Sequence, residues 1–419
     1  MPQQSPDRVV LIDALRGFAL LAIAMVHFME QFLANMAPPE HESYTRHWAG
    51  DTVLEVLFVV LVRGKGFALF SFMFGLSFAL QMGRAQQKVP GTDPRWRFAW
   101  RLAVLLGIGF VHSLVYRGDI LMIYALLGFP LLLFRDVPSR ALWATALVLV
   151  AGLPRLLMAL AASGSPAAAA EDAAAVLTYW TTLESGSWRE LFALNATEGL
   201  RGRFGFQFGP VSRAYQTFAL FLIGLWAGRL RLFEVPEAHA AIFKRLLRWC
   251  GGLTVALPLV VGGGFLVVRL LGTGESGESP SGDASARLLS PIGLAGMGLY
   301  DLWNFVMTLF YAALFVRVFQ TDTGRRLLMP FAPVGRMALT CYLTQSLAGA
   351  FLFYGAGLGL LGRVGNSVAL LLGVAVFGLQ MLVCRVWLQY FRYGPVEWLW
   401  RSLTLLRFQP MGFGGAAVR

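Results

Sequence analysis

The chain has 419 residues, of which 57% are hydrophobic and only 14% are charged. This composition excludes an ordinary soluble protein, because apolar runs long enough to cross about 30 Å of hydrocarbon recur from end to end. Lys and Arg outnumber Asp and Glu by 35 to 23, but no basic run interleaves with aromatic residues as nucleic-acid binding requires. The cationic excess is instead typical of loops retained in the cytoplasm, so the predicted partner is the lipid bilayer and not nucleic acid.

The hydropathy pattern predicts an all-α, polytopic integral membrane protein with about ten transmembrane helices. Lys and Arg gather in the loops on the same side as the N-terminus, which predicts that both termini are cytoplasmic. The predicted spans cover 9–35, 66–83, 100–116, 120–135, 141–162, 216–233, 247–271, 291–317, 338–361 and 366–390.

The spans form one predicted transmembrane domain over residues 1–419, without a convincing internal repeat. A short apolar segment at 51–63 is expected to lie along the outer interface or to re-enter the membrane. The subdivisions are N-terminal helices over 9–162, an outer loop over 163–215, C-terminal helices over 216–390 and an amphipathic cytoplasmic tail over 391–419.

The first predicted span contains three ionisable residues, Asp13, Arg16 and His27. The helical period places them on one stripe, with His27 roughly 16 Å deeper than Arg16. Charged groups at this depth are costly unless they are paired or face an aqueous cavity, so the stripe should point inward. Asp13 and Arg16 can form an ion pair at i, i+3.

Each member of this stripe has a structural and a functional interpretation. Arg16 either extends to the lipid phosphates while Asp13 neutralises it, or faces a cytoplasmic pocket and holds an anionic cofactor. His27 is either a hydrogen-bonded core residue or a proton shuttle, for which an imidazole is suited near neutral pH.

A second titratable imidazole, His112, lies in the third span within GFVHSLVYRGDILMIYALLG. Arg117, Gly118 and Asp119 form a tight turn after this span, and Asp119 either caps the next helix or orients an imidazole. Two intramembrane histidines on neighbouring helices suggest a shared cavity.

Two further polar residues complete the candidate site. Lys65 is either an interfacial anchor or a cation at the outer mouth of a cavity, and Gln345 is the likeliest of several polar residues in its span to line a cavity. The three cysteines have no CxxC spacing and the histidines fit no zinc motif, so the sequence predicts no metal and no disulfide framework.

Five blocks of this sequence resemble the YeiB-like family of bacterial inner-membrane proteins, the domain-of-unknown-function family 418. They occur in the family's order from residue 11 to about 405. The blocks read LIDALRGFALLAI, KGFALFSFMFG, GFVHSLVYRGDILMIYALLG, GRMALTCYLTQ and YFRYGPVEWLWRSLT. The resemblance implies a multi-pass protein of the bacterial inner (cytoplasmic) membrane.

The YeiB-like family in turn resembles the transmembrane acyltransferase superfamily, which includes acyltransferase-3 enzymes and the heparan glucosaminide N-acetyltransferase. Those enzymes have a ten-helix core and use cytosolic acyl-CoA to modify an acceptor on the far side of the membrane. Arg16 and His27 reproduce the Arg-to-His spacing of the acyltransferase-3 first helix. YeiB-like proteins commonly have Asn at the position of His27, so His112 is the stronger family match.

The leading hypothesis from this resemblance is acyl transfer across the inner membrane, with acetyl-CoA or another acyl-CoA as co-substrate and no tightly bound cofactor. His112, with or without His27, would be catalytic, and Asp13, Arg16, Lys65, Asp119 and Gln345 would bind substrate or co-substrate. The acceptor would be a small molecule or a glycan, and a second copy of the chain is a candidate partner. The alternatives are a small-molecule transporter with a proton-titratable path and a scaffold subunit.

Overall fold

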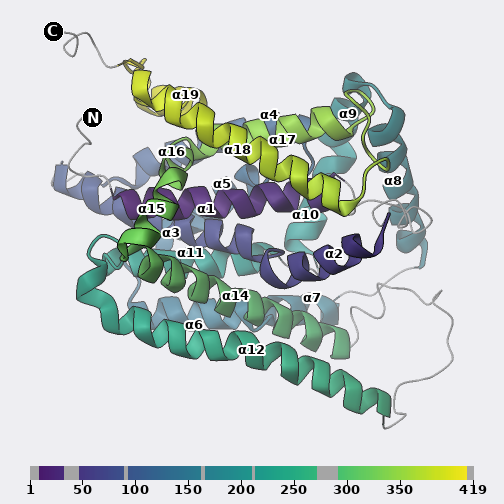
Figure 1. Ribbon diagram of the computed structural model, residues 1–419, viewed down its shortest axis with the longest axis horizontal. Coiled ribbons are helices and arrows are strands. Elements are labelled where there is room, and N and C mark those ends of the chain that lie inside the picture. The colour runs from purple at the N-terminus through teal and green to yellow at the C-terminus, as the bar shows by residue number, and fades with distance from the viewer. Residues whose placement is uncertain are drawn as a thin grey trace.

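The computed structural model describes residues 9–32, 47–88, 93–161, 166–209, 213–270 and 291–412. These residues form a bundle of helices whose axes mostly run along the longest dimension of the molecule (Figure 1). Across the described ranges there is no β-strand, only an isolated bridge between Phe391 and Gly412. The prediction of an all-α protein is therefore confirmed.

The helices of the first half differ widely in length. They are α1 (Val10–Val26) with the π-turn η1 (His27–Gln31), α2 (Ala49–Leu61), α3 (Lys65–Lys88), α4 (Arg95–Val115), α5 (Leu121–Leu131) with η3 (Leu132–Phe134), α6 (Ser139–Val150), α7 (Leu153–Ala161), α8 (Pro166–Ser185), α9 (Trp188–Leu194), the π-turn η4 (Asn195–Gly199) and α10 (Leu200–Phe208).

The second half adds five longer helices and several short ones. They are α11 (Arg213–Arg229), η5 (Pro236–His239), α12 (Ala240–Leu270), α14 (Pro291–Phe319), α15 (Asp322–Leu328), η6 (Met329–Phe331), α16 (Ala332–Arg336), α17 (Ala338–Phe353), α18 (Asn366–Tyr390) and α19 (Pro395–Leu405).

Several of these helices identify the chain as a membrane protein. Four segments are long and apolar enough to cross a bilayer: Val10–Glu30, Arg95–Val115, Gly293–Phe319 and Asn366–Tyr390. Three shorter helices are also strongly apolar.

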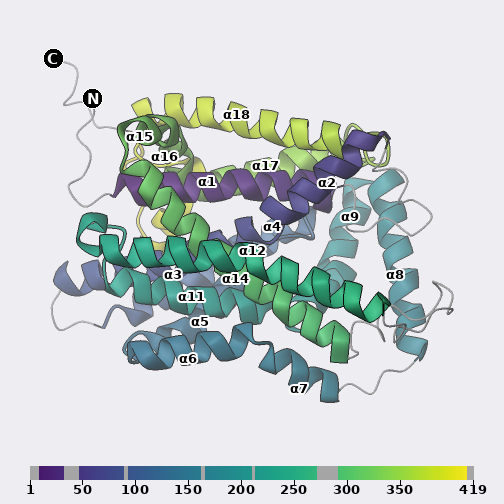
Figure 2. The ribbon, with the colours of Figure 1, turned by 60° about the horizontal axis from the view of Figure 1, so that its bottom comes forward.

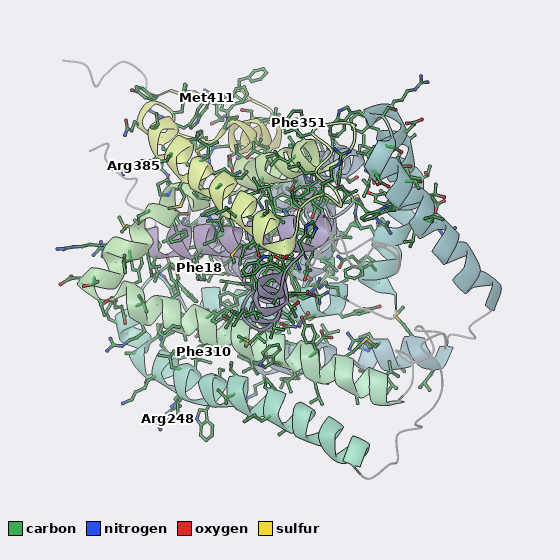
Figure 3. All side chains as sticks on the ribbon, turned by 45° about the vertical axis from the view of Figure 1, so that its right-hand side comes forward. Phe18, Arg248, Phe310, Phe351, Arg385 and Met411 are labelled. Carbon is green, nitrogen blue, oxygen red and sulfur yellow. The ribbon has the colours of Figure 1, made fainter. Side chains whose placement is uncertain are left out.

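Arg248 and Arg385 lie in the half of the bundle where α1 begins, the side on which cationic loops were predicted (Figure 3).

Helix α1 occupies the centre of the bundle, with α3, α16, α17 and α18 around it (Figures 1 and 2). Two glycines allow its close approach to α16 and η6. A Cβ added at Gly335 would lie 1.8 Å from the carbonyl oxygen of Asp13, and one at Gly17 would lie 2.1 Å from that of Phe331. Only glycine fits at such distances, so these residues set where α1 packs.

The span predicted over 141–162 is wrong as a single helix. Helix α6 ends at Val150, and Gly152 has a φ of +81°, a left-handed conformation that ends a helix. Helix α7 then begins at Leu153, with Pro154 in its first turn, where the missing N–H is tolerated.

Within the segment predicted as an outer loop over 163–215, residues 166–208 fold largely into helices. Helices α8 and α9 cross one end of the bundle (Figures 1 and 2), and the capping box formed by Ser187 and Glu190 begins α9. Helix α2 takes the place of the short segment at 51–63 and exposes apolar side chains such as Val53 and Val56.

The amphipathic tail predicted over 391–419 docks onto the bundle through α19. The Glu397 carboxylate accepts hydrogen bonds from the backbone N–H groups of Leu339 (2.6 Å) and Thr340 (3.0 Å) and so caps α17. Trp400 Nε1 donates to the Arg101 carbonyl at 3.0 Å. Helix α19 therefore ties the first turn of α17 to α4.

Candidate functional site

Two cavities enter the bundle from opposite ends and meet at the same two tyrosines. The first, of about 240 Å³, is lined by His27 and lies under α10; we call it the His27 cavity. The second, of about 220 Å³, is lined by Arg16; we call it the Arg16 cavity. Tyr124 and Tyr342 line both cavities, so only these side chains and their neighbours separate them.

His112 and Asp119 form a buried pair beside the His27 cavity. His112 Nδ1 lies 2.8 Å from Asp119 Oδ1, and the Met122 backbone N–H donates to the other carboxylate oxygen at 3.0 Å. A carboxylate can only accept, so Nδ1 carries a proton, and in the neutral tautomer with this hydrogen bond the lone pair is on Nε2. That Nε2 atom is buried and has no hydrogen-bond partner among the described residues.

The Asp119 side chain thus has both functions considered from the sequence. It caps the first turn of α5, through the Met122 N–H, and it also orients the His112 ring. Asp119 lines the His27 cavity, whereas the His112 ring lies behind its wall.

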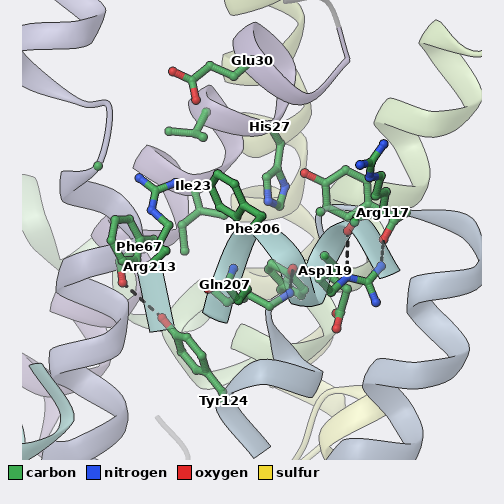
Figure 4. Close-up of a pocket in the computed structure, with 18 of the residues that line it drawn as sticks. Ile23, His27, Glu30, Phe67, Arg117, Asp119, Tyr124, Phe206, Gln207 and Arg213 are labelled. Atoms are coloured by element: carbon green, nitrogen blue, oxygen red, sulfur yellow. Dashed lines mark hydrogen bonds between the residues drawn. The ribbon is translucent and has the colours of Figure 1, made fainter. Parts of the chain in front are cut away.

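His27 is the imidazole on the cavity wall itself, at the start of the π-turn that ends α1 (Figure 4). Its Nδ1 lies 3.5 Å from the side-chain nitrogen of Gln345, at the long limit of a hydrogen bond. π-Turns often occur at functional sites, because the extra residue per turn shifts the side chains that follow.

Two tyrosines connect the two imidazoles. The Tyr116 ring centroid lies 5.0 Å from that of His27 and 5.7 Å from that of His112. The Tyr342 ring centroid lies 5.5 Å and 5.4 Å from the same two rings. The two histidines therefore contact the same two aromatic rings, but only His27 lines the cavity.

Their hydroxyl groups differ in environment. Tyr342 Oη accepts the Ile120 backbone N–H at 3.0 Å. Tyr116 Oη is buried without a hydrogen-bond partner in the described part of the chain. The Tyr116 hydroxyl group is therefore available to form a hydrogen bond with a bound molecule.

Three arginines give the His27 cavity a cationic wall: Arg117, Arg203 and Arg213. The Arg117 guanidinium lies over the Tyr179 ring at 4.6 Å and that of Arg213 lies over the Phe67 ring at 4.2 Å. Burial lowers the pKa of Arg203 and the nearby Asp119 carboxylate opposes this shift; an arginine remains charged at neutral pH.

The Arg16 cavity has a cationic entrance and an otherwise largely apolar wall. Arg16 donates to Ser77 Oγ at 2.9 Å, to the Gly335 carbonyl at 3.2 Å and to the Asp13 carboxylate at 3.2 Å. The ion pair predicted within the stripe is therefore present, and Arg16 lines the cavity while Asp13 lies behind it. The apolar lining includes Phe70, Met73, Phe74, Leu102, Leu105 and Leu121.

A third hollow, of about 370 Å³, continues from the Arg16 cavity. We call it the basic groove, because its lining includes Arg84, Arg97, Arg101 and Arg401. Gln81, Phe98 and Arg101 line both spaces, and the Arg101 guanidinium lies over the Trp400 ring at 4.3 Å. A chain of hollows thus leads from a basic surface through an apolar slot to Tyr124 and Tyr342.

The remaining predicted residues lie nearby but outside both cavity linings. Lys65 is buried; its ammonium group donates to the Val59 carbonyl at 3.0 Å and lies 3.8 Å from the centroid of the Trp303 ring. Gln345 is fully buried beside His27, and its Oε1 has no partner within the described residues. Over the described ranges, no three His, Cys, Asp or Glu side chains gather as metal ligands.

The sequence interpretation missed several residues of the site. Tyr116 and Tyr124 were not singled out, and Tyr342 was one of the polar residues ranked behind Gln345 in its span. Arg203 and Arg213 lie in RGRFGFQFGPVSR, which was assigned to a loop. The repeated arginines among aromatic residues in that stretch were the available signal, since solvated loops rarely carry so many aromatic residues.

Comparisons with known proteins place the chain among relatives along nearly its whole length. The family described as "Protein of unknown function (DUF418)" matches residues 281–407. The Bacillus subtilis "Uncharacterized protein YxaH" is 31% identical, over 98% of this chain and 97% of that protein. The Escherichia coli "Uncharacterized protein YeiB" is 29% identical, over 95% and 97%.

No solved structure matches this chain. The whole-length similarity to the Bacillus subtilis protein and the family match both agree with the motif blocks found in the sequence. The chain therefore belongs to the YeiB-like family, DUF418.

Proposed function

We propose that this protein is a transmembrane acyltransferase that moves an acyl group from cytosolic acyl-CoA to an acceptor at the outer face of the bacterial inner membrane. In this proposal the bundle has ten spans, and the end where α1 begins faces the cytoplasm. The observation that carries the proposal is the meeting of the two cavities at Tyr124 and Tyr342, beside His27 and the His112–Asp119 pair.

The basic groove and the Arg16 cavity, at the end of the bundle where α1 begins, suit the parts of an acyl-CoA molecule. The four arginines of the basic groove would bind its phosphate groups through charge-assisted hydrogen bonds. Its pantetheine arm and acyl group would enter the apolar Arg16 cavity, past Arg16. The thioester would then lie near Tyr124 and Tyr342, with the acceptor in the His27 cavity.

The chemistry assigned to the site is a single acyl transfer with His112 as general base. The acceptor hydroxyl or amine attacks the thioester carbonyl carbon, and its proton passes across the cavity wall, at Tyr116 and Tyr342, to Nε2 of His112 behind it. A C–O or C–N bond forms, the C–S bond breaks, and the proton then passes to the departing thiolate of CoA. Asp119 stabilises the imidazolium, and His27 contacts the acceptor from the cavity wall.

The test uses purified full-length protein and radiolabelled acetyl-CoA. We expect release of labelled acetate, or labelled product when an acceptor extract is added, together with saturable CoA binding. His112→Ala should lower turnover about 10²–10⁴-fold and leave CoA binding unchanged. If the wild-type protein neither binds CoA nor consumes the thioester, acyl transfer is not its function.

A second candidate, a small-molecule transporter, is favoured by the same two cavities, because a path open alternately to each end is what transport requires. It predicts flux of an unmodified cargo in proteoliposomes, coupled to a proton gradient through His27. Thioester consumption without flux excludes this candidate, and flux of unmodified cargo without thioester consumption selects it.

A further inference from the structure

The charges on the wall of the His27 cavity do not balance. Three guanidinium groups, those of Arg117, Arg203 and Arg213, face two carboxylates, those of Asp119 and Glu30. Asp119 is already bonded to His112 and to a backbone N–H. Glu30 forms an ion pair with Arg63, which lies outside the lining. The lining therefore carries one more guanidinium group than carboxylates, although Glu30 also acts on Arg213, and Asp301 and Glu198 outside the lining act on Arg213 and Arg117.

Arg203 gives the most direct indication of an anion-binding site. Its side chain is 4% exposed, its Nε donates to the Arg117 carbonyl at 2.9 Å and its Nη2 to the Tyr116 carbonyl at 3.5 Å. Its Nη1 is buried without a hydrogen-bond partner among the described residues. A buried charged donor without an acceptor is costly, so an acceptor group in the cavity would remove a real penalty.

Arg213 and Gln207 add to this arrangement from the same wall (Figure 4). The Arg213 guanidinium lies between the rings of Phe67 and Phe206, at 4.2 and 5.6 Å from their centroids. A stacked guanidinium is held in orientation while the N–H groups at its edge can still donate. Buried Gln207 Oε1 likewise has no partner in the described ranges and could accept a hydrogen bond from a hydroxyl group.

We propose that the His27 cavity binds an oxyanion, a carboxylate or a phosphate ester, through Arg203 and Arg213. Guanidinium groups match both anions in geometry, and the buried site strengthens the attraction. The role of this anion as part of the acyl acceptor depends on the function proposed above, but its binding does not. The acceptor class is thus an anionic hydroxyl or amine compound, with its nucleophile directed to the histidines.

The test compares three small molecules that share a three-carbon skeleton: glycerol, glycerate and glycerol 3-phosphate. Binding to the purified full-length protein is measured by calorimetry. We expect glycerate, glycerol 3-phosphate or both to bind at least 10-fold more tightly than glycerol. The relative affinity of the two anions identifies the carboxylate or the phosphate as the preferred group.

Variants locate the binding. Arg213→Gln should weaken anion binding at least 10-fold, whereas Arg203→Lys, which keeps the charge, should weaken it less than Arg203→Gln. Arg189→Gln, an exposed position on α9, is the matched control and should bind as the wild type does. Equal binding of all three molecules, or unchanged anion binding by a monodisperse Arg213→Gln protein, overturns the proposal.

Acetyl-CoA titrated into the same samples separates this inference from the proposed function. Anion binding without CoA binding supports the oxyanion site and contradicts acyl transfer. CoA binding with no preference for the anions over glycerol contradicts the oxyanion site alone.

Discussion

His112 and Asp119 come from opposite sides of a tight turn and lie 2.8 Å apart, with the carboxylate also fixed by the first turn of α5. The pair is nearly fully buried, at 5% and 1% exposure. Since the carboxylate fixes which ring nitrogen carries the proton, it also fixes which nitrogen can act as a base. The proposed chemistry depends on this relationship.

Asp119→Asn is expected to lower kcat for acyl transfer about 10²–10⁴-fold, the usual contribution of an oriented acid–base group. KM for acyl-CoA should change little, because Asp119 does not line the Arg16 cavity. Steady-state kinetics on purified protein measure both constants. Glu184→Gln, at an exposed position of α8, serves as the control. A normal kcat for Asp119→Asn contradicts the assigned role.

The two imidazoles are expected to respond differently to substitution. His112→Ala should reduce kcat about 10²–10⁴-fold. His27→Asn keeps a hydrogen-bonding side chain on the cavity wall, so it should mainly raise KM for the acceptor and leave most of kcat. Kinetics with varied acceptor concentration distinguish the two. If His27→Asn is the more damaging for kcat, the base is His27 and the roles must be exchanged.

Arg97→Gln in the basic groove is expected to raise KM for acetyl-CoA roughly 5- to 10-fold, the effect of losing a charge-assisted hydrogen bond worth about 1–1.4 kcal/mol, with kcat unchanged. Arg401→Gln should behave in the same way. Dephospho-acetyl-CoA, which lacks one phosphate, should show a smaller effect. Arg140→Gln, exposed and outside the groove, is the control. Wild-type KM values for both groove variants would place the phosphates elsewhere.

Gly335→Ala is expected to destabilise the protein by about 1–3 kcal/mol, since the new methyl group would clash with the Asp13 carbonyl at 1.8 Å. Gly378→Ala in α18 meets no atom within 4 Å among the described residues and should be neutral or stabilising by up to about 1 kcal/mol. Thermal unfolding in detergent compares the pair. A Tm for Gly335→Ala at or above that of Gly378→Ala contradicts the close α1–α16 contact.

Local patterns were enough to predict much of the framework. Apolar runs predicted nearly every long helix, and the helical period placed Arg16 and His27 on one stripe. The structure places these two residues on the walls of different cavities along α1. The turn at Gly118 also predicted the position of Asp119 as a cap just before the first turn of α5.

Non-local relationships were beyond the sequence pattern. Tyr342 lies more than two hundred residues from Ile120, whose N–H it accepts, and no spacing rule connects them. The break at Gly152 depends on a positive φ inside an apolar run. The helices of 166–208 were hidden by an Ala-rich and Gly-containing stretch, so Arg203, which α10 brings to the His27 cavity, could not be placed.

The partition between the two cavities has the thickness of aromatic side chains. Under the proposed reaction, neither the CoA carrier nor the acceptor has to cross the bilayer; only the acyl group crosses this thin partition. Acyl transfer of this kind does not require the large rocking motions of alternating-access carriers, because rotation of the Tyr124 and Tyr342 rings is sufficient. Cross-linking the long helices to one another should leave its turnover intact.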